Sequence, residues 1–249
     1  MRDFTHDSQW LSLNTATLRR QRGQDVPLAR IIDQCAAHGV HTISPWRDQV
    51  QAAGLAATAL DAPCLVLVVG ALPGALAGTP GYRDIARARA EVRDGIAATL
   101  AHARDVGMPL AIEPLHPMQA ADRACVNTLE HALDLCDELD AARTGLLGVA
   151  LDVYHVWWDP KLQAQIARAG ADRLLAYHVC DWRLPTRDLL ADRGMMGDGI
   201  IELRKIRGWV EAAGFAGCCE VEIFSEADWW QRDGDETLAV CIERHRSVV

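Results

Sequence analysis

The sequence lacks the features that mark nucleic-acid-binding and membrane proteins. Lysine and arginine number 25 against 34 aspartates and glutamates, a formal net charge of -9, so a phosphate-backbone partner is not expected. No apolar run approaches the roughly 18 residues that a membrane span needs. Residues 1–17 contain no apolar core of a signal peptide. We therefore expect a cytoplasmic protein that binds neither nucleic acid nor a membrane.

The sequence also lacks a cysteine pair with metal-binding spacing. Its eight cysteines include no CxxC pair, and most of them fall within expected strands or helices. Cysteines in such positions are typically buried, reduced thiols that pack like small apolar side chains. We expect free thiols, and a cysteine metal site is the weaker alternative.

Short apolar runs alternate with longer amphipathic stretches along the whole chain. This alternation is typical of βα units around a parallel sheet. We expect strands at 11–15, 42–46, 64–70, 110–115, 147–153, 174–180 and 218–223. We expect helices at 26–38, 83–106, 127–139, 159–169, 202–213 and 235–245, the third capped by Asn127. No linker interrupts them, so residues 1–249 are expected to form a single domain.

These strands favour an α/β fold, a (β/α) barrel of the TIM type, over a dinucleotide-binding fold. No GxGxxG motif follows the first strand, although a dinucleotide-binding fold uses this motif to bind pyrophosphate. A TIM barrel has eight strands, whereas the sequence shows seven. Only 17 residues separate Trp46 from Cys64, so one βα unit is expected to be missing near residues 54–61.

Four late strands end in side chains that can bind a metal ion. These are Glu113, Asp152, His178 and Glu222. In a barrel the C-terminal ends of the strands build the active site, so we expect the four side chains to converge. Three carboxylates and one imidazole suit Mn²⁺, Mg²⁺, Co²⁺ or Zn²⁺. Without a cation the carboxylates would repel one another.

Glu220 is the alternative to Glu222 as the fourth ligand. Both side chains lie on one face of the expected strand, because side chains alternate along a strand with period two. Glu222 is nearer the C-terminal end, so we expect it to bind the metal. Glu220 would then lie about 7 Å deeper, behind the ligands or in a buried ion pair.

Further residues near these strand ends are candidates for binding the substrate. Arg183 could bind a hydroxyl or a phosphate, and Asp181 could orient a metal ligand. The long stretch 181–199 is expected to form a functional loop, in which Arg187 or Arg193 could clamp the substrate. The remaining candidates are Asn14, Trp46 and His116.

The chain resembles the sugar phosphate isomerase/epimerase group of the xylose-isomerase-like (AP endonuclease family 2) TIM-barrel superfamily. The motifs that carry this resemblance are AIEPLHP, LDVYHVWWDP, YHVCDW, DRGMMGDGII and EVEIFSEADWW. The resemblance implies that the four candidate ligands bind one divalent metal ion. It also implies that Glu113 and Glu222 act as acid and base on opposite faces of a sugar, and that His155 contacts a substrate hydroxyl or carbonyl.

The expected function is that of a divalent-metal-dependent isomerase or epimerase of a sugar or cyclitol. Such an enzyme moves a proton next to a carbonyl, while a cation such as manganese stabilises the enediolate. A metal-dependent lyase or dehydratase acting on a keto-sugar or inosose begins with the same step, and the sequence leaves it open. A non-catalytic sugar-binding protein also stays open, because the N-terminal half is short. A homodimer is a reasonable expectation.

Overall fold

The computed structural model describes residues 2–54, 61–70, 72, 81 and 83–249. The chain divides into two compact units. Unit 1 consists of Met1–Leu60, Tyr177–Glu211 and Gly217–Val249, and unit 2 consists of Asp61–Ala176 and Ala212–Ala216. The single domain expected over residues 1–249 stays a prediction. Within the described residues, no helix is both long enough and apolar enough to cross a membrane.

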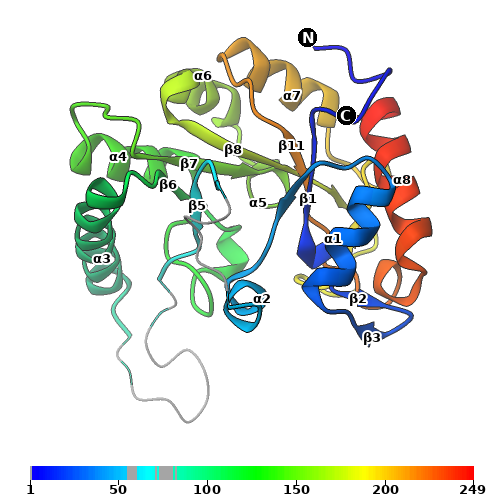
Figure 1. Ribbon diagram of the computed structural model, residues 1–249. Helices are drawn as coiled ribbons and strands as arrows, with labels where there is room; N and C mark the ends of the chain where they lie inside the picture. Colours follow the sequence, from blue (N-terminus) through cyan, green and yellow to red (C-terminus); the bar gives the residue numbers. More distant parts are fainter. Residues whose placement is uncertain (1, 55–60, 71, 73–80, 82) are drawn as a thin grey trace. The chain divides into compact units, whose positions relative to one another are not determined.

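Unit 1 holds the first, second and last strands of the main sheet. β1 (Leu11–Asn14) pairs in parallel with β4 (Thr42–Ser44) on one side and with β11 (Cys219–Val221) on the other. Helix α1 (Leu28–Ala37) buries an apolar face and lies beside α8 (Gly234–Ser247), as Figure 1 shows. The other elements are α2 (Arg47–Ala52), α7 (Leu203–Ala212), β2 (Arg20–Gln21), β3 (Gln24–Asp25), β9 (Asp181–Trp182), β10 (Arg193–Gly194), and the 3₁₀ turns η1 (Thr15–Thr17) and η4 (Trp229–Gln231).

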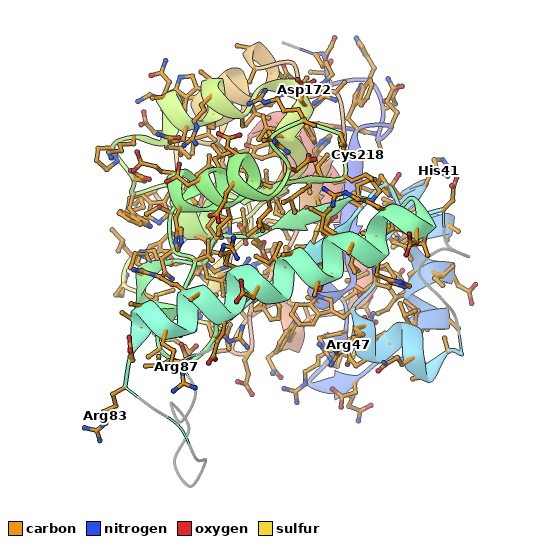
Figure 2. The ribbon with its side chains drawn as sticks, turned by 90° about the vertical axis from the view of Figure 1, so that its left-hand side faces the viewer. His41, Arg47, Arg83, Arg87, Asp172 and Cys218 are labelled. Carbon is orange, nitrogen blue, oxygen red and sulfur yellow. The ribbon has the colours of Figure 1, made fainter. Side chains whose placement is uncertain are left out.

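Unit 2 holds three neighbouring strands of the same sheet. β6 (Leu110–Ile112) pairs in parallel with β5 (Leu65–Leu67) and β7 (Leu147–Asp152). Every residue of β6 and β7 is buried, as expected of strands covered on both faces. Figure 2 shows the long helix α3 (Ile85–Val106), with Arg87 near its start. The other elements are α4 (Leu129–Leu139), α5 (Val153–Val156), α6 (Leu162–Arg173) and the 3₁₀ turn η3 (Pro117–Gln119).

The strand order of the main sheet is β4–β1–β11–β8–β7–β6–β5. Strand β8 (Leu174–Val179) passes from one unit into the other. All seven predicted strands are confirmed, each within its predicted range. Within the described residues, β4 and β5 are the two edges of this sheet, which is where the sequence predicts a missing βα unit. Most of that predicted gap, residues 55–60, lies outside the described residues.

The start of α4 differs from the prediction. Thr128, and not Asn127, is the N-cap, because the Thr128 hydroxyl accepts a hydrogen bond from the backbone N–H of His131 at 3.1 Å. The amide of Asn127 donates instead to the carbonyl oxygens of Leu115 and Ala124, at 3.1 and 2.8 Å. The Asn127 prediction was wrong because these partners lie in a preceding loop, whose path local spacing does not reveal.

A buried ion pair joins α4, β7 and α6 within unit 2. The side chain of Arg173 is 1% exposed and donates to Oδ2 of Asp140 at 2.8 Å. The same guanidinium donates to the carbonyl oxygens of Leu147, Cys136 and Asp140, at 2.6, 3.2 and 2.6 Å. A buried cation is costly unless it is paired and hydrogen-bonded, so Asp140 is essential to this arrangement.

The N-terminal segment of unit 1 packs on a buried histidine of α8. Phe4 stacks on His245 with ring centroids 4.4 Å apart, and the guanidinium carbon of Arg207 lies 3.5 Å from the centroid of the Phe4 ring. Burial is the main cause that lowers the pKa of His245 to about 4, with further lowering by the positive charges of Arg207, Arg246 and Arg2. The packing of this segment therefore depends on a neutral imidazole.

Replacing Asp140 with alanine should lower the free energy of unfolding by about 3–5 kcal/mol, because the guanidinium of Arg173 would stay buried without its partner. Urea denaturation monitored by circular dichroism measures this change. Asp137→Ala is the control, since its 43%-exposed carboxylate lies 3.6 Å from Arg173, and an exposed pair contributes about 1 kcal/mol or less. Equal losses in the two variants would contradict the buried role of Asp140.

Acidification should weaken the fold through His245. Its pKa in the folded protein, about 4, lies below that of an unfolded histidine, so the unfolded chain binds more protons between about pH 6.5 and pH 4. The free energy of unfolding should fall across this window, by about 3 kcal/mol once His245 is fully protonated. His245→Gln should flatten this dependence in denaturation curves measured between pH 7 and 4. The matched change His102→Gln, at an exposed position of α3, should leave the slope as in the wild type.

Candidate metal centre

Glu113 and Asp152 stand at the ends of neighbouring parallel strands in unit 2. Glu113 directly follows β6, whose register pairs Ile112 with Val149 of β7. Asp152 ends β7 and caps α5, because its Oδ1 accepts a hydrogen bond from the backbone N–H of Tyr154 at 2.9 Å. Both carboxylates are buried, and burying two carboxylates on adjacent strands costs free energy unless positive charge or donors compensate them.

Two histidines support Asp152. Nε2 of His155, in α5, lies 3.6 Å from Oδ2 of Asp152. Nδ1 of His155 accepts a hydrogen bond from the backbone N–H of His116 at 3.1 Å, which leaves the proton of a neutral ring on Nε2, facing Asp152. The His116 ring packs edge-on against Trp158 at 5.5 Å, and burial lowers its pKa. His155 is thus placed to orient Asp152, and His116 holds His155 through its backbone.

His178 lies in β8, and Glu222 directly follows the neighbouring parallel strand β11, both in unit 1. The register of β8 and β11 pairs His178 with Glu220, and the backbone N–H of Glu222 donates to the carbonyl oxygen of Val179 at 3.1 Å. The imidazole lies between two carboxylates. Its Nδ1 is 3.8 Å from Oε2 of Glu222, and its Nε2 is 3.7 Å from Oε1 of Glu220. The two ring nitrogens therefore face different glutamates of one strand.

Arg193 holds the carboxylate of Glu222. Its Nη1 donates to Oε2 of Glu222 at 3.1 Å and approaches the carbonyl oxygen of the same residue at 3.4 Å. The guanidinium carbon lies 5.0 Å from the centroid of the Phe224 ring, and the backbone N–H of Arg193 donates to the carbonyl oxygen of Phe224 at 2.9 Å. Arg187, the other arginine singled out in this loop, pairs with Asp192 instead. Sequence reasoning pointed to the loop but could not choose between the two arginines.

The carboxylate of Asp181 organises the segment that follows β8. Its Oδ1 accepts hydrogen bonds from the backbone N–H groups of Trp182 and Ile201, at 2.8 and 3.0 Å. Its Oδ2 accepts from those of Gly197 and Gly199, both at 2.9 Å. Glycine is required at 199, because a Cβ there would lie 2.1 Å from the carbonyl oxygen of Trp182. Burial raises the pKa of Asp181. The four backbone hydrogen bonds that the Asp181 carboxylate accepts order the loop after β8.

The four predicted ligands form one cluster. Each of Glu113, Asp152, His178 and Glu222 offers a ligand atom, these atoms lie within 4.8 Å of one another, and all four residues are buried. Glu220 is not in this set, and its Oε1 accepts a hydrogen bond from Nδ2 of Asn14 at 2.8 Å. Three carboxylate oxygens and one imidazole nitrogen are a donor set that Mn²⁺, Mg²⁺, Co²⁺ and Zn²⁺ accept. The residues present therefore fit a divalent metal ion.

The other predicted substrate-binding residues are engaged within unit 1. Nη1 of Arg183 donates to Oδ2 of Asp228 at 2.9 Å. Nε1 of Trp46 donates to Oδ1 of Asn14 at 2.8 Å, and the Trp46 ring packs edge-on against Phe224 at 5.5 Å. Contacts of Arg183, Trp46, Asn14, His116 and His155 with a substrate stay predictions.

Among solved structures, the chain is highly similar to a bacterial protein. A protein of Sinorhizobium meliloti 1021 is 47% identical, the match covers 97% of this chain and 99% of that chain, and the TM-score is 0.87. No protein with a curated description matches the chain.

Two more distant structures share the fold. The IolI protein, whose crystal structure contains a zinc atom, is 18% identical over 97% of this chain and 98% of that chain, with a TM-score of 0.70. The probable 3-DHS dehydratase AsbF of Bacillus anthracis is 14% identical over 94% and 97%, with a TM-score of 0.66. The family model of the xylose isomerase-like TIM barrel matches residues 31–239. The chain therefore belongs to the xylose isomerase-like TIM barrel family.

Proposed function

We propose that this protein is a divalent-metal-dependent isomerase or epimerase that moves a proton next to the carbonyl of a sugar or cyclitol. The observation that carries this proposal is the buried cluster of three carboxylates and one imidazole, with ligand atoms within 4.8 Å of one another. The fold agrees with it, because proteins of similar fold include one that contains zinc and one described as a probable dehydratase.

Glu113 and Glu222 are the residues proposed to move the proton. A divalent cation bound by the four-residue cluster would polarise the substrate carbonyl and offset the negative charge that develops on its oxygen. A carboxylate can take a proton from carbon as a base and return one as an acid. Epimerisation needs one group of each kind, and the two buried glutamates supply a matched pair.

The neighbours of these carboxylates limit their freedom of rotation. Arg193 binds one oxygen of Glu222 at 3.1 Å, so this carboxylate is held at one end. His155 faces Asp152 at 3.6 Å and is itself held by a backbone hydrogen bond. Groups fixed before the substrate binds lower the cost of reaching the reactive geometry. We propose that Arg193 and His155 serve this purpose and contact substrate hydroxyls.

The aromatic side chains of unit 1 support a sugar or cyclitol as the substrate. Trp46 packs beside a cluster formed by Ala16, Phe224 and Trp230. A sugar ring presents an apolar C–H face that the partly exposed ring of Trp46 could cover, while its hydroxyls need polar partners. A lyase or dehydratase acting on a keto-sugar or inosose would use the same groups for its first step.

Metal analysis is the first test of the proposal. After incubation with Mn²⁺, Co²⁺ or Zn²⁺ and removal of the excess, the protein should retain one equivalent of metal. A concentration of 100 times the dissociation constant should stabilise the fold by about 2.7 kcal/mol, measured as a rise in the melting temperature. Asp152→Asn should abolish both effects, whereas Asp172→Asn, at a 69%-exposed carboxylate, should preserve them. A wild-type protein that retains no stoichiometric metal would rule out the proposed function.

Turnover is the second test. In a screen of ketoses, inososes and 3-keto-sugars, Glu222→Gln should lower kcat by about 100-fold or more, because the amide cannot exchange a proton with carbon. Metal content is measured in parallel, and Glu226→Gln, at a 65%-exposed position, is the control. Reactions in deuterated water separate the two chemistries, since an isomerase incorporates deuterium into an isomeric sugar and a lyase yields a dehydrated or cleaved product. Full turnover by metal-loaded Glu222→Gln would exclude the assigned role.

A further inference from the structure

We infer that Glu220 is a positioning residue for the metal ligand His178, and that Asn14 and Trp46 hold Glu220 in place. This inference rests on the proposed function, because it assumes that His178 binds a metal ion. It assigns a role to Glu220, which is not part of the metal cluster. It also assigns a role to Asn14 and Trp46, which the sequence predicted as substrate-binding residues.

The strand register puts His178 between two glutamates. Glu220 and Glu222 point to one face of their strand segment, and the parallel register sets His178 of β8 directly beside Glu220. Nδ1 of the ring is 3.8 Å from Oε2 of Glu222, which belongs to the metal cluster, and Nε2 is 3.7 Å from Oε1 of Glu220. One ring nitrogen therefore faces Glu222, a member of the metal cluster, while the other faces Glu220.

Glu220 is held by an amide whose orientation is determined. Oδ1 of Asn14 accepts hydrogen bonds from Nε1 of Trp46 at 2.8 Å and from the backbone N–H of Ala16 at 3.0 Å. Both partners can only donate, so the other end of the amide must be the NH₂ group. This group donates to Oε1 of Glu220 at 2.8 Å. The chain of contacts thus runs from the residue before α2, through the end of β1, to β11.

A carboxylate at this place selects one form of the imidazole. A neutral histidine binds a metal through the nitrogen that lacks a proton, and the partner of the other nitrogen determines which one that is. A carboxylate facing Nε2 favours the tautomer with the proton on Nε2. The lone pair is then on Nδ1, the nitrogen that lies on the side of Glu222. Glu220 is only 13% exposed and His178 only 2%, so solvent screens this interaction weakly.

The predicted consequence concerns metal affinity. Loss of a partner behind a metal-binding histidine typically weakens metal binding by about 10- to 100-fold. Glu220→Gln is the sharpest variant, because the amide oxygen can still accept the hydrogen bond from Asn14 while the negative charge facing Nε2 is removed. Titration of the metal-free protein with Zn²⁺ should show a dissociation constant raised by about 10-fold or more. Glu226→Gln, the same chemical change on the segment after β11, should bind Zn²⁺ as the wild type does.

Two further measurements separate positioning from a general structural role. Nitrogen-15 NMR of the zinc-loaded, histidine-labelled wild type should show His178 protonated at Nε2 and metal-bound at Nδ1. The melting temperature of metal-free Glu220→Gln should stay close to that of the metal-free wild type. Asn14→Ala should also weaken Zn²⁺ binding, because it frees Glu220 from its anchor.

The outcomes distinguish this inference from the proposed function. A wild-type protein that binds no Zn²⁺ overturns the proposed function itself. A wild type that binds Zn²⁺ together with a Glu220→Gln variant of equal affinity overturns the role of Glu220 and leaves the metal centre standing. Coordination through Nε2, or a fall in affinity matched by a lower stability of the metal-free variant, overturns it as well.

Discussion

The mutual repulsion of buried carboxylates is the constraint on which the rest of the site depends. Glu113, Asp152 and Glu222 bring their oxygens close together in a place that water hardly reaches. Negative charges in such surroundings raise one another's free energy unless positive charge lies among them. The protein supplies part of this charge through the guanidinium of Arg193. A divalent cation would supply the remainder, and the donor set is of the kind that binds one.

The loops after the strands are ordered mainly by side chains that bind backbone groups. Asp181 gathers four N–H groups of the segment that carries Arg193. The same segment is tied to the residues after Glu222, because the backbone N–H of Arg193 binds the carbonyl oxygen of Phe224 and Arg183 binds Asp228. The arginine and the glutamate that it holds therefore belong to loops that are fixed to each other. The hydrogen bond from the Arg193 guanidinium to one oxygen of Glu222 requires that both loops be held in fixed positions.

Much of the fold and of the site could be predicted from the sequence, for a local physical reason. Strands buried on both faces are short apolar runs, so all seven were found within the correct ranges. A metal-binding side chain at the end of such a run, or directly after it, can point in few directions, which is why Glu113 and Asp152 were predicted as ligands. The cap of α4 was mistaken, because two neighbouring residues can both cap a helix and the choice between them depended on a loop. The substrate contact of Arg183 stays a prediction, and its ion pair with Asp228 was not foreseen, because Asp228 lies 45 residues away in the chain.

The sequence by itself determined the strands, their parallel character and the four residues able to bind a metal ion. Alternation along a strand could not separate Glu220 from Glu222, because both point to the same face. Tertiary structure decided this question by placing His178 beside Glu220 and directing its two nitrogens toward different carboxylates. It also turned Asn14 and Trp46 toward Glu220, through hydrogen bonds between strands that are distant in the chain. The sequence specifies which chemical groups are present, whereas strand register and long-range hydrogen bonds specify which atom of each group faces which partner.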